Sequence, residues 1–158
     1  MSGTDNGATP EARLAELGIS LPDVAAPVAS YVPAVRSGNY VYTAGQLPFV
    51  DGALPLTGKV GAGVSPEEAT DLARTCALNG LAAIRSLVGT LDGARIVKVT
   101  GFVASDPSFT GQPGVINGAS NVLGEIFGDA GVHARSAVGV AVLPLDSPVE
   151  VELVVELS

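Results

Sequence analysis

Apolar and polar residues alternate most regularly in the last quarter of the chain. From residue 149 to residue 157 every odd-numbered position is Val or Leu, and three of the four even-numbered positions are Glu. Residues 136–143 repeat this period of two, with valines on one face and small residues on the other: Val138, Val140 and Val142, then Ala137, Gly139 and Ala141. A period of two predicts strands. We expect the row of small residues to lie close to another chain.

A helical period predicts two long helices before these strands. The first begins at Ser65-Pro66-Glu67-Glu68, where the serine can cap the helix and Glu68 can complete a capping box. Its apolar positions recur to about residue 88. The second helix is expected over residues 112–127, and a short one over residues 11–17. Each of these last two is followed directly by a glycine, which commonly ends a helix.

The front of the chain has the pattern of a β-hairpin. Residues 31–36 and 40–45 are two short β-type runs, and Ser37-Gly38-Asn39 between them favours a turn. Residues 96–104 are a further predicted strand. The order is therefore ββαβαββ, which predicts a single α+β domain with its helices on one face of the sheet. Because the other face carries Val154 and the small residues, we expect it to be covered by oligomerisation.

One domain accounts for the whole chain, since 158 residues can bury roughly 70% of their unfolded surface. We assign residues 1–27 to an N-terminal tail with the short helix. Residues 28–158 form the predicted domain, and they contain no internal repeat or linker.

Charge and cysteine content narrow the class of partner and compartment. The net charge is −8, and the eight Lys and Arg residues are scattered, so nucleic acid and anionic membranes are poor partners. No apolar stretch approaches the ~20 residues of a membrane span, and the first residues lack the pattern of a signal peptide. Cys76 is the only cysteine and lies in a helical pattern, so we expect a buried thiol. Together these features favour a cytoplasmic protein.

Three sequence features that could indicate catalysis have simpler interpretations. The glycine-rich run at residues 58–63 lacks the spacing of a phosphate-binding loop, so we interpret it as a surface loop. With one His and one Cys, no cluster has the spacing of metal ligands, and we expect no cofactor. A Ser-His-Asp triad would have to use His133, and the nucleophile motif Gly-Xaa-Ser-Xaa-Gly is absent.

Arg135 differs from these features because it begins an otherwise uncharged strand. A turn at residues 144–148 would pair this strand with the last one in antiparallel fashion, which puts Arg135 and Glu150 at opposite ends of the pair. The two side chains therefore meet only if another chain or a strand offset brings them together. From its position alone, the favoured interpretation of Arg135 is a solvated strand end.

Two segments resemble the signature motifs of the Rid/YjgF (RidA-like, reactive intermediate deaminase) family. Residues 135–144, RSAVGVAVLP, with the following Val149-Glu150-Val151-Glu152, resemble its C-terminal signature. Residues 38–48, GNYVYTAGQLP, resemble its N-terminal hairpin, where a Ser/Ala-Gly-Gln-hydrophobic-Pro run is usual. The resemblance covers about residues 28–157. The extended front and the run NGAS at residues 117–120 resemble a divergent subgroup often labelled endoribonucleases.

This resemblance implies a chorismate-mutase-like fold that assembles as a homotrimeric barrel with three clefts between subunits. Each cleft would be built from two chains, which would bring Arg135 and Glu150 together. In archetypal members the strand arginine holds a substrate carboxylate by two parallel donors, as a guanidinium does well. The substrate is a reactive 2-imino or enamino acid, which is hydrolysed to a 2-keto acid and ammonia.

The family pattern assigns roles residue by residue. Arg135 would bind the carboxylate and Glu150 would help to place the attacking water. Tyr31 and the backbone at Gly45 would complete the pocket. An asparagine of the second helix contributes in the family; Asn117 is the closest match, and Asn121 lies one turn further along the same face.

Two departures from the family pattern affect the expected activity. The usual hairpin serine is Ala44, which removes a hydroxyl, and the frequent cysteine two positions after the arginine is Ala137. We therefore hold three hypotheses. The first is an enamine/imine deaminase, the second a non-catalytic trimer that binds a small carboxylate metabolite at the same arginine, and the third an endoribonuclease. The acidity of the chain and the lack of paired histidines argue against the third.

Overall fold

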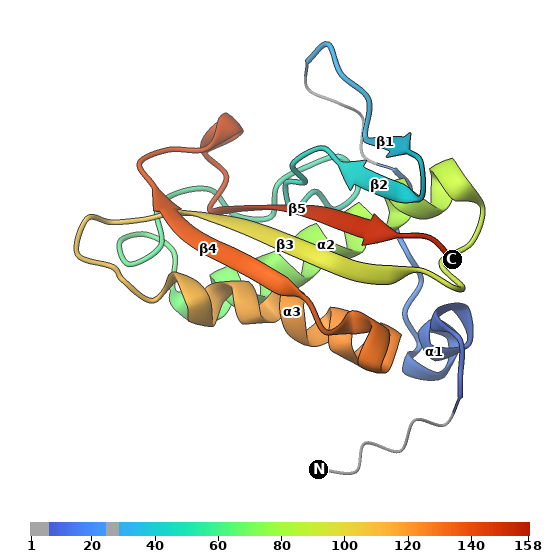
Figure 1. Ribbon diagram of the computed structural model, residues 1–158. Helices are drawn as coiled ribbons and strands as arrows, with labels where there is room; N and C mark the ends of the chain where they lie inside the picture. The colour runs from blue at the N-terminus through green and yellow to red at the C-terminus, as the bar shows by residue number, and fades with distance from the viewer. Residues whose placement is uncertain (1–6, 25–28) are drawn as a thin grey trace.

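The computed structural model describes residues 7–24 and 29–158, which fold into one sheet with its helices on one side (Figure 1). The described elements are, in chain order, α1 (Pro10–Leu17), β1 (Ala34–Ser37), β2 (Tyr40–Thr43), α2 (Pro66–Val88), β3 (Arg95–Ala104), α3 (Gln112–Phe127), η1 (Gly128–Gly131), β4 (Ala134–Val140), η2 (Pro144–Asp146) and β5 (Val149–Glu156). The predicted ββαβαββ order is confirmed, and so is the α+β class. No helix among these is long and apolar enough to cross a membrane.

The order of the strands differs from the one that the turn at residues 144–148 predicts. The sheet runs β1-β2-β5-β3-β4, so β5 lies between β2 and β3, antiparallel to both. β4 pairs only with β3, in parallel, and forms an edge. The expected antiparallel pair of β4 and β5 is therefore wrong. The segment between them makes a 3₁₀ turn with Leu145 and Asp146 at positive φ, and it carries the chain past β3 instead of folding it back.

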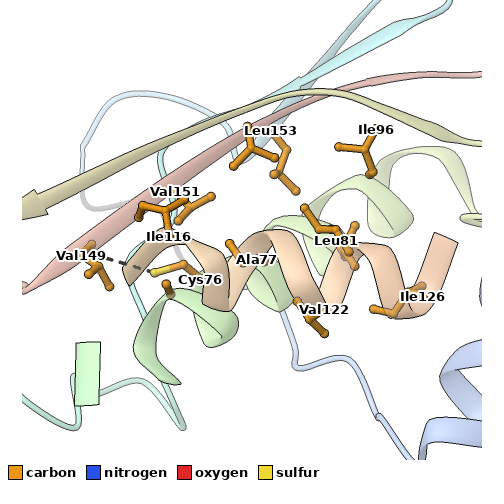
Figure 2. Packing of buried hydrophobic residues seen from close by; sticks show 14 of the residues in the cluster. Cys76, Ala77, Leu81, Ile96, Ile116, Val122, Ile126, Val149, Val151 and Leu153 are labelled. Atoms are coloured by element: carbon orange, nitrogen blue, oxygen red, sulfur yellow. Dashed lines mark hydrogen bonds between the residues drawn. The ribbon is translucent and has the colours of Figure 1, made fainter. Parts of the chain in front are cut away.

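The core lies between the sheet and the two long helices. Figure 2 shows side chains of α2 and α3 meeting the buried row of β5, which consists of Val149, Val151, Leu153 and Val155. Cys76 is fully buried there, as predicted, and its Sγ lies 4.0 Å from the carbonyl oxygen of Val149. Burial raises the pKa of this thiol well above its usual value, and Glu150 adds to the rise. Cys76 is therefore a packing residue, not a reactive thiolate.

The local signals that set the helix ends are confirmed. The Oγ of Ser65 accepts a bond from the backbone of Glu68, and the Glu68 carboxylate accepts one from the backbone of Ser65, which completes the capping box. Gly18 ends α1 in the left-handed conformation. The hairpin turns at Gly38 and Asn39, with Gly38 at positive φ. Its first strand is shorter than predicted, because the chain bends at residues 29–31 and Pro33 has no N–H for a ladder.

Two of the small residues, Ala137 and Gly139, face α3 of their own chain, so the close approach expected at them is made by that helix and not by another chain. Ala141 lies after the end of β4 and is exposed. Ala137 lies against the hydrophobic core, and a side chain at Gly139 would collide with Gln112 at the start of α3. The valine face is the open one, since Val138 is 42% exposed. The small residues thus allow α3 to approach β4 closely, and this sets the position of the predicted site residues on these two elements.

The N-terminal helix is joined to the rest of the chain by a core residue and by side-chain bonds. Leu14 is buried in the core, and Arg13 donates to the carbonyl oxygen of Glu125 at the end of α3. Glu11 pairs with Arg85 at 3.1 Å. The boundary at residue 28 stays a prediction, because residues 25–28 lie outside the described residues.

Candidate functional site

Arg135 lies on the helix-facing side of the edge strand β4, where its side chain reaches α3. Its register partner is the buried Val99 of β3, so the two side chains share one face of the sheet. Nη1 donates to Oδ1 of Asn117 at 2.8 Å and to Oγ of Ser120 at 3.2 Å. Nη2 donates to the carbonyl oxygen of Pro113 at 3.1 Å. The helix therefore fixes the guanidinium from one side.

All three acceptors of Arg135 are neutral groups. Within the described part of the chain, the ion pairs are formed by other residues, and no carboxylate pairs with this guanidinium. A guanidinium offers five N–H donors, and none of the three bonds uses Nε. Nε–H and one Nη2–H thus remain, and these two nitrogens form an edge that a carboxylate can bridge with parallel bonds. The arrangement supplies an uncompensated, oriented cation.

Asn117 and Asn121 were alternatives for the same role, and the structure separates them. Asn117 accepts the bond from Arg135, whereas Asn121 is exposed and has no hydrogen bond to Arg135 among the described residues. Ala137 follows Arg135 by two positions and lies on the same face of β4. A methyl group stands there, so it provides packing but no hydrogen bond.

Two further polar residues at Arg135 were missed by sequence reasoning. Ser120 bonds Arg135 and lies 2.9 Å from Nε2 of His133, whose Nδ1 lies 2.6 Å from the carbonyl oxygen of Gly131. The sequence spacing of these polar residues contained a signal for this cluster. Asn117 and Ser120 are three apart on a helix, and His133 and Arg135 are two apart at the start of a strand. It could be used only with the knowledge that α3 packs over β4.

Glu150 belongs to a second group of predicted residues, which lies on the opposite face of the sheet. Its register partner is Phe102, on the open face. A side chain at Gly45 would overlap the Glu150 carboxylate, so the glycine lets the carboxylate lie directly against the backbone. Burial raises the pKa of Glu150, and the nearby charge of Glu152 raises it further. Ala44 directly precedes this contact.

The two groups do not meet within one chain. Arg135 and Glu150 point to opposite faces, and β3 separates their strands. The sequence therefore predicted their separation correctly but for a wrong reason, because they are not at opposite ends of one strand pair. Tyr31 lies in a bend before β1 and is 43% exposed. The residues of the predicted site thus lie in separate parts of the chain, and Arg135 and Asn117 are the pair that a side-chain hydrogen bond joins.

The open face of the sheet carries apolar side chains between charged ones. Val35, Tyr42 and Val138 are 52%, 49% and 42% exposed, and register pairing links them through β5 and β3 to Val154 and Phe102. Exposed apolar surface of this extent on a sheet is typical of a face that contacts another subunit. For metal binding, the described residues contain no group of three His, Cys, Asp or Glu side chains that could hold an ion.

The environment of Glu150 predicts a pH-dependent effect on stability. A raised pKa means that folding penalises the ionised carboxylate, so the penalty is absent below the unfolded-state pKa and grows as pH rises through the folded-state pKa. We expect Glu150→Gln to leave the free energy of unfolding unchanged near pH 4 and to raise it at pH 7. Urea denaturation at the two pH values measures this, with Glu67→Gln at the exposed start of α2 as the control. Equal effects of both substitutions would contradict it.

Comparison with known proteins gives one consistent result. A family model described as "YjgF/chorismate mutase-like, putative endoribonuclease" matches residues 11–157. Protein TCP17 of Trypanosoma cruzi is 46% identical over 149 residues, which cover 93% of each chain. The crystal structure of a "putative endoribonuclease" from Shewanella oneidensis MR-1 superposes with a TM-score of 0.91 and is 36% identical, covering 95% of this chain and all of its own.

A more distant structure was determined with a small molecule. The crystal structure of Escherichia coli TdcF with bound serine superposes with a TM-score of 0.63 and is 26% identical. The match covers 85% of this chain and 94% of TdcF.

Proposed function

Because the chain belongs to the YjgF/chorismate-mutase-like family, we propose that it binds small carboxylates at Arg135 and hydrolyses 2-imino and enamino acids there. The products are a 2-keto acid and ammonia. The observation that carries the proposal is the guanidinium of Arg135, which is held by neutral acceptors and keeps its Nε edge for an anion. The serine bound to TdcF carries such a carboxylate, which supports the ligand class.

The chemistry that we assign to the site is hydrolysis without electron transfer. Water adds to the carbon of the C=N bond, and the C–N bond then breaks. Both hydrogens of the water end on the nitrogen, which leaves as ammonia, and the water oxygen stays as the keto group. An enamino acid first moves a hydrogen from its nitrogen to its terminal carbon and so becomes the imine that is hydrolysed. Arg135 holds the substrate by its carboxylate and so keeps the reacting carbon in place. Glu150 accepts a proton from the water, a task for which a raised pKa suits a carboxylate near neutral pH.

This role requires a second subunit, and we propose a homotrimer. Arg135 and Glu150 lie on opposite faces within one chain, so a site with both needs Glu150 from a neighbouring copy. The exposed apolar side chains of the open face supply the surface for such an interface. Gly45 and Tyr31 would come from the same neighbour as Glu150, since Gly45 contacts the Glu150 carboxylate and the hairpin follows Tyr31.

A coupled assay tests the activity. A serine dehydratase releases 2-aminoacrylate, which hydrolyses to pyruvate on its own, and we expect the protein to accelerate pyruvate release severalfold. Ala44→Ser restores the hydroxyl usual at this position, and we expect it to raise that acceleration about three- to tenfold, the range of a modest catalytic hydrogen bond. Ala62→Ser, in an exposed loop, is the control. Carboxylate binding without turnover in both the wild type and Ala44→Ser would instead establish the non-catalytic metabolite binder.

RNA cleavage is the function that the site supports least, although the family description and the Shewanella protein carry that name. The chain has a net charge of −8, and its one histidine is engaged with Ser120 and Gly131. RNA cleavage that persists through stringent purification and is lost in Arg135→Ala would instead favour an endoribonuclease over the proposed hydrolysis of imino acids.

A further inference from the structure

Ser120 and His133 form a chain of hydrogen bonds that ends at Arg135 and that the proposed function leaves without a role. Ser120 Oγ lies 2.9 Å from Nε2 of His133 and 3.2 Å from Nη1 of Arg135. On its far side the imidazole is fixed by the carbonyl oxygen of Gly131, 2.6 Å from Nδ1. The three side chains come from α3, from the residue before β4 and from β4 itself. Through these hydrogen bonds, a change in the charge of His133 can affect the guanidinium of Arg135.

The direction of each bond follows from the available donors. A carbonyl oxygen only accepts, so Nδ1 of His133 must carry a hydrogen. In the neutral imidazole Nε2 is then an acceptor, and the hydroxyl hydrogen of Ser120 points to it. A lone pair of Oγ is left to accept from Nη1 of Arg135. Neutral His133 thereby orients Ser120, and Ser120 holds the guanidinium with its Nε edge turned away.

We propose that Ser120 and His133 are positioning residues for Arg135, and that protonation of His133 strengthens carboxylate binding at that arginine. The inference rests on the proposed binding of carboxylates at Arg135. The two bonds place Nε2 and Nη1 no more than about 6 Å apart, a distance at which two positive charges repel measurably in a protein. A bound carboxylate offsets that repulsion. Proton and carboxylate therefore favour each other's binding, and by linkage the coupling is reciprocal.

The elements that pack near His133 carry other charged residues. These are Glu125 on α3, Asp129 on η1, and Arg95 and Lys98 on β3. None of them has a hydrogen bond or ion pair with His133 in the described part of the chain. Arg135 is thus the charged group to which the imidazole is linked, through Ser120.

Pyruvate, the keto acid product of the assay above, is the probe. We expect its dissociation constant to fall about three- to tenfold from pH 8 to pH 5.5, the range in which an imidazole gains its proton. In His133→Gln and Ser120→Ala the change is expected to be less than twofold, and Ser120→Thr, which keeps the hydroxyl, should recover most of it. Glu150 is present in the wild type and in all three variants, so any effect of its titration on the pH dependence of pyruvate binding cancels when the four proteins are compared.

A spectroscopic measurement on the wild type needs no variant to fold. His133 is the only histidine of the sequence, so the imidazole signals in ¹⁵N NMR belong to it alone. We expect the neutral ring to carry its hydrogen on Nδ1. Two results would overturn the inference: a neutral ring with its hydrogen on Nε2, or a His133→Gln protein whose pyruvate binding depends on pH as strongly as that of the wild type. As long as the wild type binds pyruvate, neither result affects the proposed function. A wild type that does not bind pyruvate at either pH would overturn both.

Discussion

Replacing Arg135 with glutamine is expected to weaken pyruvate binding and to lower kcat/KM in the dehydratase-coupled assay by about a hundredfold or more. Two charge-assisted hydrogen bonds to the ligand are lost, at roughly 1.5–3 kcal/mol each, and every 1.4 kcal/mol is a factor of about ten. Arg135→Lys keeps the charge but not the two-donor edge, so we expect an intermediate loss of about tenfold. Calorimetric titration and the coupled assay measure the two effects.

Arg36 provides the matched control for this experiment. It lies on the hairpin strand β1, and its Nε donates to the carbonyl oxygen of Gly38 in an exposed setting. Arg36→Gln removes the same charge from the chain but should change binding less than twofold. A folded Arg135→Gln protein that binds pyruvate as tightly as Arg36→Gln would remove the basis of the proposed function.

The elements of this fold could be predicted because their signals are local. A capping serine, a glycine stop and a period of two each act within a few residues, and α3 has the predicted bounds. The order of the strands could not be predicted in the same way. The pattern of β5, with one fully buried row and one half-buried row, fits a strand with neighbours on both sides as well as one in a hairpin. The central position of β5 in the sheet is set by its pairing with β3, a strand that lies far from it in sequence.

The candidate site was predictable only where family motifs identified it. Arg135 and Glu150 were found by resemblance, and their opposite faces explain why no spacing argument could join them. His133 is not part of that resemblance, and Ser120 enters it only as the last residue of the NGAS run, without a role; their link to Arg135 becomes visible when α3 is seen to cover β4. The close approach of α3 to β4 is therefore what brings Asn117 and Ser120 to Arg135, and Gly118 shows how tightly the position of α3 is set.

Gly118→Ala is expected to lower the free energy of unfolding by about 3 kcal/mol, the upper range for overpacking a well-filled interface. Gly118 is buried where α3 crosses α2, and a Cβ at this position would overlap the carbonyl oxygen of Thr70 and lie 2.9 Å from its carbonyl carbon. Backbone atoms cannot turn aside as a flexible side chain does, so the helices must separate. Urea denaturation measures the loss.

Gly124→Ala, on the same helix, is the control that separates packing from helix propensity. A Cβ at Gly124 would have no heavy atom within 4 Å, so the substitution should be neutral or stabilise by up to about 1 kcal/mol, as alanine does in a helix. Because Asn117 and Ser120 flank Gly118 and both bond Arg135, the separation of the helices should also weaken pyruvate binding in Gly118→Ala alone. Equal stabilities of the two variants would show that α3 can move without cost, and Arg135 would then not be held by the packing of that helix.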